Sequence, residues 1–217
     1  MNQHTKKFIT ATIIASGLWL IFFQLPAYIF SLTLVGILVT IICTEWKKFF
    51  PTNSLHFWAI MPLYPILPFA LIIYMNQIEL YHELVYYLFL MVFSFDAGAY
   101  VTGSFLGKNL IAPSITPKKT VEGFIGGYFS AVALFVVALY DKQISFSLVP
   151  MLLFTFVVCS FAFLGDLFES FLKRRAHLKD SGTILPGHGG FLDRFDAVMF
   201  TVFFFFVFRN YLILYLK

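Results

Sequence analysis

Charged and hydroxyl side chains gather in one stretch, residues 165–196, which is therefore the candidate functional site. It holds ten Asp, Glu, Lys and Arg residues in a chain that is only 12% charged, and apolar runs flank it on both sides. Charge this dense beside segments of membrane-spanning length is costly unless it is paired, hydrated or bound to ions. Helical spacing places Asp166, Ser170 and Lys173 on one face. With Glu169 at its edge, that face could hold a cation and an oxyanion side by side.

A purely structural alternative for this helix end is a membrane interface whose charges neutralise one another. It would account for the cations at 173–175, because long basic side chains can reach the interface while their stems stay in the apolar layer. It accounts less well for Asp166, which lies deeper and directly follows Gly165. We therefore predict a functional role for Asp166, and with it for Ser170 and Glu169.

Two further acids, Asp193 and Asp196, flank Arg194 where the last apolar run begins. The dipole of a helix N-terminus could stabilise them without any function. Together with Asp166, however, they would form a site of oxygen ligands only. Mg²⁺ prefers such ligands and keeps water and phosphate oxygens in its coordination shell. The pattern predicts a Mg²⁺ site with Asp166 and Asp193 as ligands and Asp196 as a third candidate.

Two loops carry the features of a phosphate site. In the first, Gly189 and Gly190 follow His188, and glycines allow backbone amides to approach an anion; the alternative is a histidine that packs the loop. No second histidine stands at ligand spacing, which argues against zinc. In the second, Lys118, Lys119 and a hydroxyl precede a predicted helix N-terminus. This second loop lacks the order of a Walker A motif, and its alternative is a cationic topology anchor.

The elements that must position these side chains are membrane helices. The 217 residues are 60% hydrophobic with a mean hydropathy of +0.86, whereas a soluble domain is nearer half apolar and a quarter charged. The apolar residues come in long runs and do not alternate, which disfavours a membrane β-barrel. Spanning helices satisfy their own backbones, so we predict an all-α polytopic bundle. The net charge of +4 suits an anionic membrane surface or substrate, and no nucleic-acid motif is present.

We predict about seven spans in a single domain, residues 1–217, divided into N-terminal spans (1–83) and catalytic spans and loops (84–217). The first run resembles a signal peptide, but no small-residue cleavage site follows, so we expect it to be retained. Three prolines should leave the third span kinked or partly irregular. The acid at 45 and its neighbours Trp46, Lys47 and Lys48 are interpreted as an interfacial span end. The predicted spans are 8–23, 27–44, 57–76, 84–105, 123–140, 148–175 and 195–215, with a polar turn at 79–83 and a polar loop at 107–122.

Basic residues are distributed unevenly over the two sides that seven spans define. Twelve lysines and arginines fall on the N-terminal side and three, Lys142, Arg209 and Lys217, on the other. The positive-inside rule then predicts that the candidate chemistry faces the cytoplasm. One acid, Asp96, lies inside a span, where an ionisable residue is a functional candidate that we expect to pair with a basic loop residue.

Three blocks of this sequence together resemble the phosphatidate cytidylyltransferase (CDP-diacylglycerol synthase) family. The resemblance covers about the last 130 residues. Two blocks are Asp96-Ala97-Gly98-Ala99-Tyr100 and the segment 117–123. The third is the family signature, carried here by Ser170, Lys173, Arg174, Lys179, Asp180, Gly182, Pro186, His188, Gly189, Gly190, Asp193, Arg194 and Asp196.

The resemblance implies that the chain converts CTP and phosphatidate to CDP-diacylglycerol and pyrophosphate. It implies catalytic roles for Asp166, Ser170, Lys173, Arg174, Asp193, Arg194 and Asp196. It implies substrate contacts for Asp96, Lys118, Lys119, Thr120, Glu122, Glu169, Lys179, Asp180, His188, Gly189 and Gly190. A cation centre of Mg²⁺, with K⁺ as a second candidate ion, and a homodimer are also expected, in a bacterial inner membrane.

Three other functions remain open. A CTP-dependent polyprenol kinase would use similar substrates, and a phospho-sugar polyprenyl transferase would also use aspartates in the membrane. A transporter would be the non-enzymatic alternative. It predicts polar residues at mid-membrane in both halves, whereas here they gather on one side.

Overall fold

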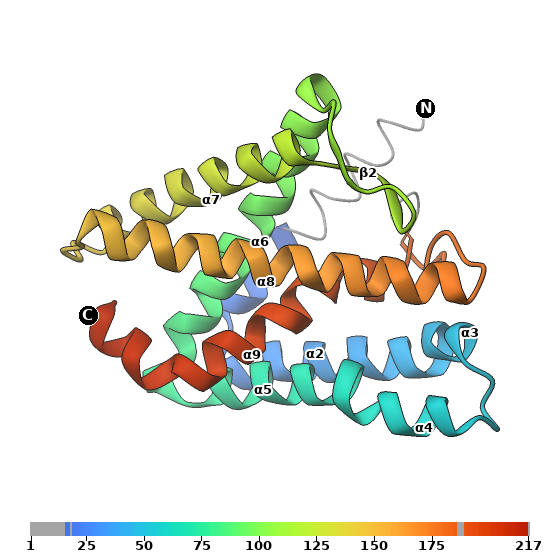
Figure 1. Ribbon diagram of the computed structural model, residues 1–217. Helices are drawn as coiled ribbons and strands as arrows, with labels where there is room; N and C mark the ends of the chain where they lie inside the picture. Colours follow the sequence, from blue (N-terminus) through green and yellow to red (C-terminus); the bar gives the residue numbers. More distant parts are fainter. Residues whose placement is uncertain (1–15, 18, 186–188, 217) are drawn as a thin grey trace. The chain divides into compact units, whose positions relative to one another are not determined.

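The computed structural model describes residues 16–17, 19–185 and 189–216. Within these ranges, six helices are long and apolar enough to cross a membrane (Figure 1). They confirm the all-α class and match six of the seven predicted spans. The remaining predicted span, 8–23, lies mostly outside the described residues. The six helices are Ala27–Phe49, Leu55–Gln77, Glu79–Leu106, Val121–Asp141, Leu148–Arg175 and Leu192–Tyr215.

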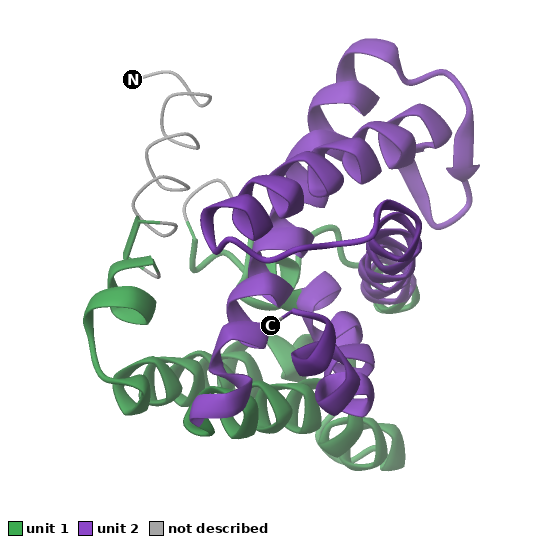
Figure 2. Ribbon diagram, turned by 90° about the vertical axis from the view of Figure 1, so that its left-hand side faces the viewer, with its two compact units in different colours: residues 1–78, 172–195 green, residues 79–171, 196–217 purple. Residues whose placement is uncertain are grey.

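The chain divides into two compact units (Figure 2). Unit 1 contains residues 1–78 and 172–195, and unit 2 contains residues 79–171 and 196–217. Helix α8 (Leu148–Arg175) belongs mainly to unit 2, and its last four residues belong to unit 1. Helix α9 (Leu192–Tyr215) begins in unit 1 and continues in unit 2.

Unit 1 is built on two spans that each contain a π-helical segment. Helix α2 (Ala27–Thr40) continues through η1 (Ile41–Trp46) into the short helix α3 (Lys47–Phe49). The second span consists of α4 (Leu55–Ile60), η2 (Pro62–Ile66) and α5 (Leu67–Gln77), and α5 packs against α2. A proline has no backbone N–H for the helical ladder, so the distortion at η2 confirms the predicted effect of the prolines.

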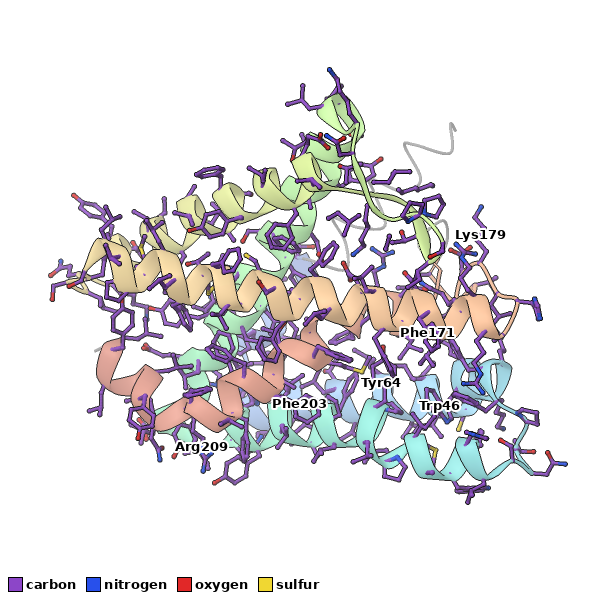
Figure 3. The ribbon with its side chains drawn as sticks, viewed as in Figure 1. Trp46, Tyr64, Phe171, Lys179, Phe203 and Arg209 are labelled. Carbon is purple, nitrogen blue, oxygen red and sulfur yellow. The ribbon has the colours of Figure 1, made fainter. Side chains whose placement is uncertain are left out.

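Polar and aromatic contacts join the two spans of unit 1. Asn76 donates from Nδ2 to the Ala27 carbonyl at 2.7 Å and to Ser31 Oγ at 2.9 Å. At the other end, the fully buried indole of Trp46 donates to the Phe57 carbonyl at 3.3 Å. Its ring lies 6.1 Å from that of Tyr64 (Figure 3). Interhelical hydrogen bonds of this kind hold helices together where lipid removes the hydrophobic driving force.

Unit 2 begins with α6 (Glu79–Leu106), so the predicted turn at 79–83 is wrong. The extended backbone of Ile78 (φ −98°, ψ 113°) separates α5 from α6, and Glu79 then lies in the first turn of α6. An acid at that position is favoured by the helix dipole, which is consistent with the helix beginning at Glu79. In the second half of α9, the guanidinium of Arg209 lies 4.3 Å from the ring centroid of Phe206.

The predicted loop 107–122 contains a small antiparallel hairpin, β1 (Leu110–Ala112) and β2 (Thr116–Thr120), before α7 (Val121–Asp141). Thr120 ends β2 and caps α7, because its Oγ1 accepts a hydrogen bond from the Gly123 amide at 3.1 Å. Helices α6 and α7 pack closely against each other (Figure 1). A Cβ atom on Gly127 would lie 2.6 Å from the Phe95 carbonyl oxygen, so only glycine permits this approach.

Candidate active site

The candidate residues of unit 2 centre on an ion pair between Lys119 and Asp166. Lys119 comes from strand β2 and Asp166 from α8, and both side chains are largely buried, at 26% and 15% exposed. The ammonium of Lys119 also lies 5.2 Å from the ring centroid of Phe163, one turn earlier on α8. This aromatic face helps hold the cation beside the carboxylate. The structure thus brings together two residues that the sequence placed in separate blocks.

The two lysines of the hairpin have different surroundings. Successive side chains of a strand point to opposite faces, so Lys118 and Lys119 diverge. Lys118 is exposed, whereas Lys119 pairs with Asp166. A ligand that reaches the Asp166 carboxylate therefore meets Lys119 in the same place.

Glu122 closes the base of the hairpin. Its carboxylate accepts hydrogen bonds from the amides of Lys108 and Asn109 at 3.1 and 3.2 Å and from Asn109 Nδ2 at 2.6 Å. The Val121 amide adds a bond to the Asn109 carbonyl at 2.9 Å. These contacts fix the strand that carries Lys119 to the start of α7. Glu122 thereby supports the position of Lys119 through the backbone.

Gly165 brings the Asp166 turn of α8 against the first part of α9. A Cβ atom on Gly165 would lie 2.5 Å from the Asp196 carbonyl oxygen and 3.0 Å from Ala197 Cα. A side chain at 165 would therefore push the two helices apart. Asp196 itself is buried, at 8% exposed, and accepts a hydrogen bond from the Ala197 amide at 3.0 Å.

The candidate residues of unit 1 centre on the carboxylate of Asp193, in the first turn of α9. Lys173 Nζ donates to Oδ1 at 2.8 Å, and this ion pair is buried, with side chains 14% and 5% exposed. The Ser181 amide donates to Oδ2 at 2.9 Å and the Gly190 amide to the same oxygen at 2.8 Å. Ser181 Oγ also lies 2.9 Å from Oδ2. Asp193 thus joins Ser181 and Gly190, which lie between α8 and α9, to the first turn of α9.

This loop explains why α9 begins at Leu192, earlier than the predicted 195. Gly189 adopts a left-handed conformation (φ +80°), and its carbonyl accepts a hydrogen bond from the Leu185 amide at 3.0 Å. Glycine takes this conformation without strain, and the chain turns there into the helix. Asp193 is one of the polar residues that suggested a loop at 192–194. It lies in the first turn of α9, and its side chain accepts hydrogen bonds from the loop residues Ser181 and Gly190.

Sequence reasoning missed Glu45, a residue of unit 1 that contacts this loop from the N-terminal half of the chain. Its side chain is 0% exposed. Its carboxylate accepts hydrogen bonds from the amides of Phe191 and Leu192, both at 2.8 Å. The only sequence signal was an acid at a span end next to Trp46, and that pattern is also typical of a membrane interface.

The remaining candidates fall into three groups. Arg174, Lys179, Asp180 and Arg194 are exposed, and Arg174 donates to the Leu178 carbonyl at 3.4 Å. Ser170 and Asp96 are partly buried, and Glu169 is fully buried. His188 lies outside the described residues. The predicted contacts of these residues with substrate stay predictions.

The donor chemistry at the acids is suited to Mg²⁺, since carboxylate and backbone oxygens are hard ligands. Among the described residues, no group of three or more His, Cys, Asp or Glu side chains lies together as a preformed metal site. Asp166 and Asp193 are instead each paired with a lysine. Cation binding would have to displace or share these lysines.

Residues 2–212 match the model of the cytidylyltransferase family. The chain belongs to this family. Among similar proteins, the phosphatidate cytidylyltransferase of Staphylococcus aureus (strain COL) is 35% identical over 211 residues, which cover 93% of this chain and 80% of that protein. The enzyme of the same name from Bacillus subtilis (strain 168) is 39% identical over 157 residues, or 72% and 58% of the two chains. That of Staphylococcus haemolyticus (strain JCSC1435) is 46% identical over 118 residues, or 54% and 45%.

The cytidylyltransferase family match confirms the resemblance inferred from the three sequence blocks. It extends that resemblance over the N-terminal spans as well, which include Glu45. The aligned part spans about half the length of the Bacillus subtilis and Staphylococcus haemolyticus relatives, at 58% and 45%.

Proposed function

We propose that this chain transfers the cytidylyl group of CTP to phosphatidate, giving CDP-diacylglycerol and pyrophosphate. The match of residues 2–212 to the cytidylyltransferase family carries the proposal. The similar bacterial proteins share the name phosphatidate cytidylyltransferase, which supports phosphatidate as the acceptor. In the described part of the chain, six helices of membrane-spanning length fit a reaction on a lipid substrate.

In this reaction a phosphate oxygen of phosphatidate attacks the α-phosphorus of CTP. A new P–O bond forms there, the bond to the β-phosphate oxygen breaks, and pyrophosphate leaves. The attacking oxygen is already anionic, so no general base is required. Both reactants are polyanions, and the main tasks are charge neutralisation and in-line positioning.

The described side chains supply groups for these tasks. Lys119 and Lys173 each carry a positive charge in a largely buried setting, where it acts more strongly on a phosphate than at an exposed position. Each lysine is held by an acid, so its ammonium is already oriented before a substrate arrives. We propose that both lysines bind phosphate groups, with Lys118 and Arg174 as exposed cations that attract the nucleotide.

We also propose that Asp166 and Asp193 are Mg²⁺ ligands. A bound Mg²⁺ would neutralise phosphate charge and stabilise the leaving pyrophosphate. Each aspartate would contribute a negatively charged ligand, and its charge is balanced by the neighbouring lysine. Asp196 is a further candidate ligand, and K⁺ a candidate second ion.

The position of a ³²P label in CTP tests the reaction and distinguishes it from the kinase alternative. Purified protein in detergent would be given phosphatidate with CTP that carries ³²P at either the α or the γ position. Cytidylyl transfer moves the α label into the lipid phase and leaves the γ label in water. A lipid kinase would give the opposite distribution with a polyprenol acceptor, and a transporter would give no labelled lipid with either. An Asp193→Asn variant, which we expect to be slower by orders of magnitude, serves as the low-activity control.

A further inference from the structure

The start of α9 is fixed by a residue from the other end of the sequence. Glu45 Oε1 accepts a hydrogen bond from the Phe191 amide, and Oε2 accepts one from the Leu192 amide, both at 2.8 Å. The first amides of a helix have no partner within the helix. A carboxylate at this position satisfies two of them and is stabilised by the helix dipole. Glu45 therefore caps α9 from outside its own sequence neighbourhood.

Ser181 connects this carboxylate to that of Asp193. Its hydroxyl oxygen lies 3.0 Å from Glu45 Oε2 and 2.9 Å from Asp193 Oδ2. A hydroxyl has one proton, so it donates to one of the two carboxylates at a time. The Ser181 amide donates to Asp193 in addition. Glu45 thus reaches Asp193 by two routes: through Ser181 and through the first turn of α9.

The loop around Glu45 is built to admit its side chain. A Cβ atom on Gly182 would lie 3.1 Å from Glu45 Oε1, and one on Gly190 would also collide with the Glu45 carboxylate. One turn after Glu45, Lys48 Nζ donates to the Ser181 carbonyl at 3.2 Å. Glu45 itself lies in the π-helical segment η1. Such segments are frequent at functional sites because they change the direction of the side chains they carry.

We propose that Glu45 is a positioning residue for the transferase reaction, which holds Ser181 and the start of α9 and thereby orients the Asp193 carboxylate. The inference rests on the proposed function. It gives the N-terminal spans a role in that function, whereas the sequence motifs assign them no role. Glu45 acts through Ser181 and the backbone of α9, and it needs no contact with substrate.

The variant Glu45→Gln tests this role with almost no change in shape. Both oxygens of Glu45 accept backbone N–H groups. A glutamine has one oxygen and one NH₂ group, so either orientation of its amide places a donor against a backbone donor. A buried donor left without an acceptor is costly. The loop should therefore loosen even though the residue volume is preserved.

Amide hydrogen exchange on the full chain in detergent reads the loop directly, without substrate. The Gly190, Phe191 and Leu192 amides should exchange at least about tenfold faster in Glu45→Gln than in wild type, the change expected when about 1.4 kcal/mol of protection is lost. Asn76→Ala is the matched control, since it removes two hydrogen bonds from a buried polar residue of unit 1 elsewhere. It should leave these three amides unchanged. Unchanged exchange in Glu45→Gln would overturn the proposal.

Kinetics then separates positioning from general stability. Glu45→Gln should lower kcat by about 10- to 100-fold, the range for residues that orient a ligand or catalytic group, with a small change in the KM for CTP. Asn76→Ala should keep kcat near wild type, even if it lowers the melting temperature as much as Glu45→Gln does. Equal kcat losses in the two variants would show that Glu45 serves stability alone.

A second variant covers the case in which Glu45→Gln does not fold. Ser181→Ala removes the hydroxyl between the two carboxylates and keeps the hydrogen bond from the Ser181 amide to Asp193. It should therefore lower kcat several-fold, which is less than the loss expected for Glu45→Gln. Wild-type kcat after Ser181→Ala would contradict the hydroxyl route. If wild-type protein makes no CDP-diacylglycerol, the proposed function fails, while the exchange experiment still decides whether Glu45 orders the loop.

Discussion

Lys119 and Asp166 form an ion pair that joins the hairpin strand β2 to helix α8. The sequence assigned them to different tasks, the lysine to phosphate and the aspartate to metal. Their contact brings the two predicted tasks to one place. A phosphate–cation complex that binds there would exchange partners with both members of the pair at once, so that no buried charge is left unpaired.

A double-mutant cycle tests whether this pair acts as a unit. Lys119→Met and Asp166→Asn should each lower kcat/KM by about 10²-fold or more, because each removes charge that stabilises the transition state. The double variant should lose less than the product of the two single losses, since interacting groups are not additive. Multiplicative losses would show that the two residues act independently.

The adjacent lysines provide a second test because strand geometry separates their side chains. Lys119→Ala should account for most of the loss in kcat/KM of about 10²-fold or more that we predict for removing both lysines. Lys118→Ala should act mainly on the KM for CTP and become less severe at high salt, as expected for an exposed cation. Equal effects on kcat from the two single variants would show that both lysines contact the reacting phosphates.

A magnesium titration tests the role of Asp193. Asp193→Asn preserves size but removes the negative charge, so activity should fall by orders of magnitude and the residual rate should require more Mg²⁺. Asp141→Asn, an exposed acid at the end of α7, is the control and should keep the wild-type midpoint. Asp166→Asn should behave like Asp193→Asn. A near-normal rate with an unchanged Mg²⁺ midpoint in either site variant would exclude that aspartate as a ligand.

Single cysteines test the orientation in the membrane. In a background without Cys43 and Cys159, a cysteine in place of exposed Lys179 should react with an impermeant thiol reagent only after cells are opened. A cysteine in place of exposed Lys142, in the turn after α7, should react in intact cells. The basic asymmetry of the loops is the reason for this expectation. The reverse labelling pattern would place the candidate site on the outer side.

The sequence alone determined the class of the protein, most of its spans and its family. Apolar runs of spanning length admit only a helical bundle or a closed barrel, and their lack of alternation decides between these. The family followed from a signature of closely spaced polar residues, which is a local property of the chain. The prolines at 62 and 65 likewise marked the distorted segment η2, because a missing N–H acts within a few residues.

Only the tertiary structure decided which polar residues work together. Lys119 and Asp166 are 47 positions apart, and Glu45 and Leu192 are 147 apart. No periodicity encodes such pairs. An acid at a span end has the same sequence context whether it faces lipid headgroups or is fully buried against a helix N-terminus, as Glu45 is. The difference lies in which backbone donors reach it, and folding alone brings those donors there.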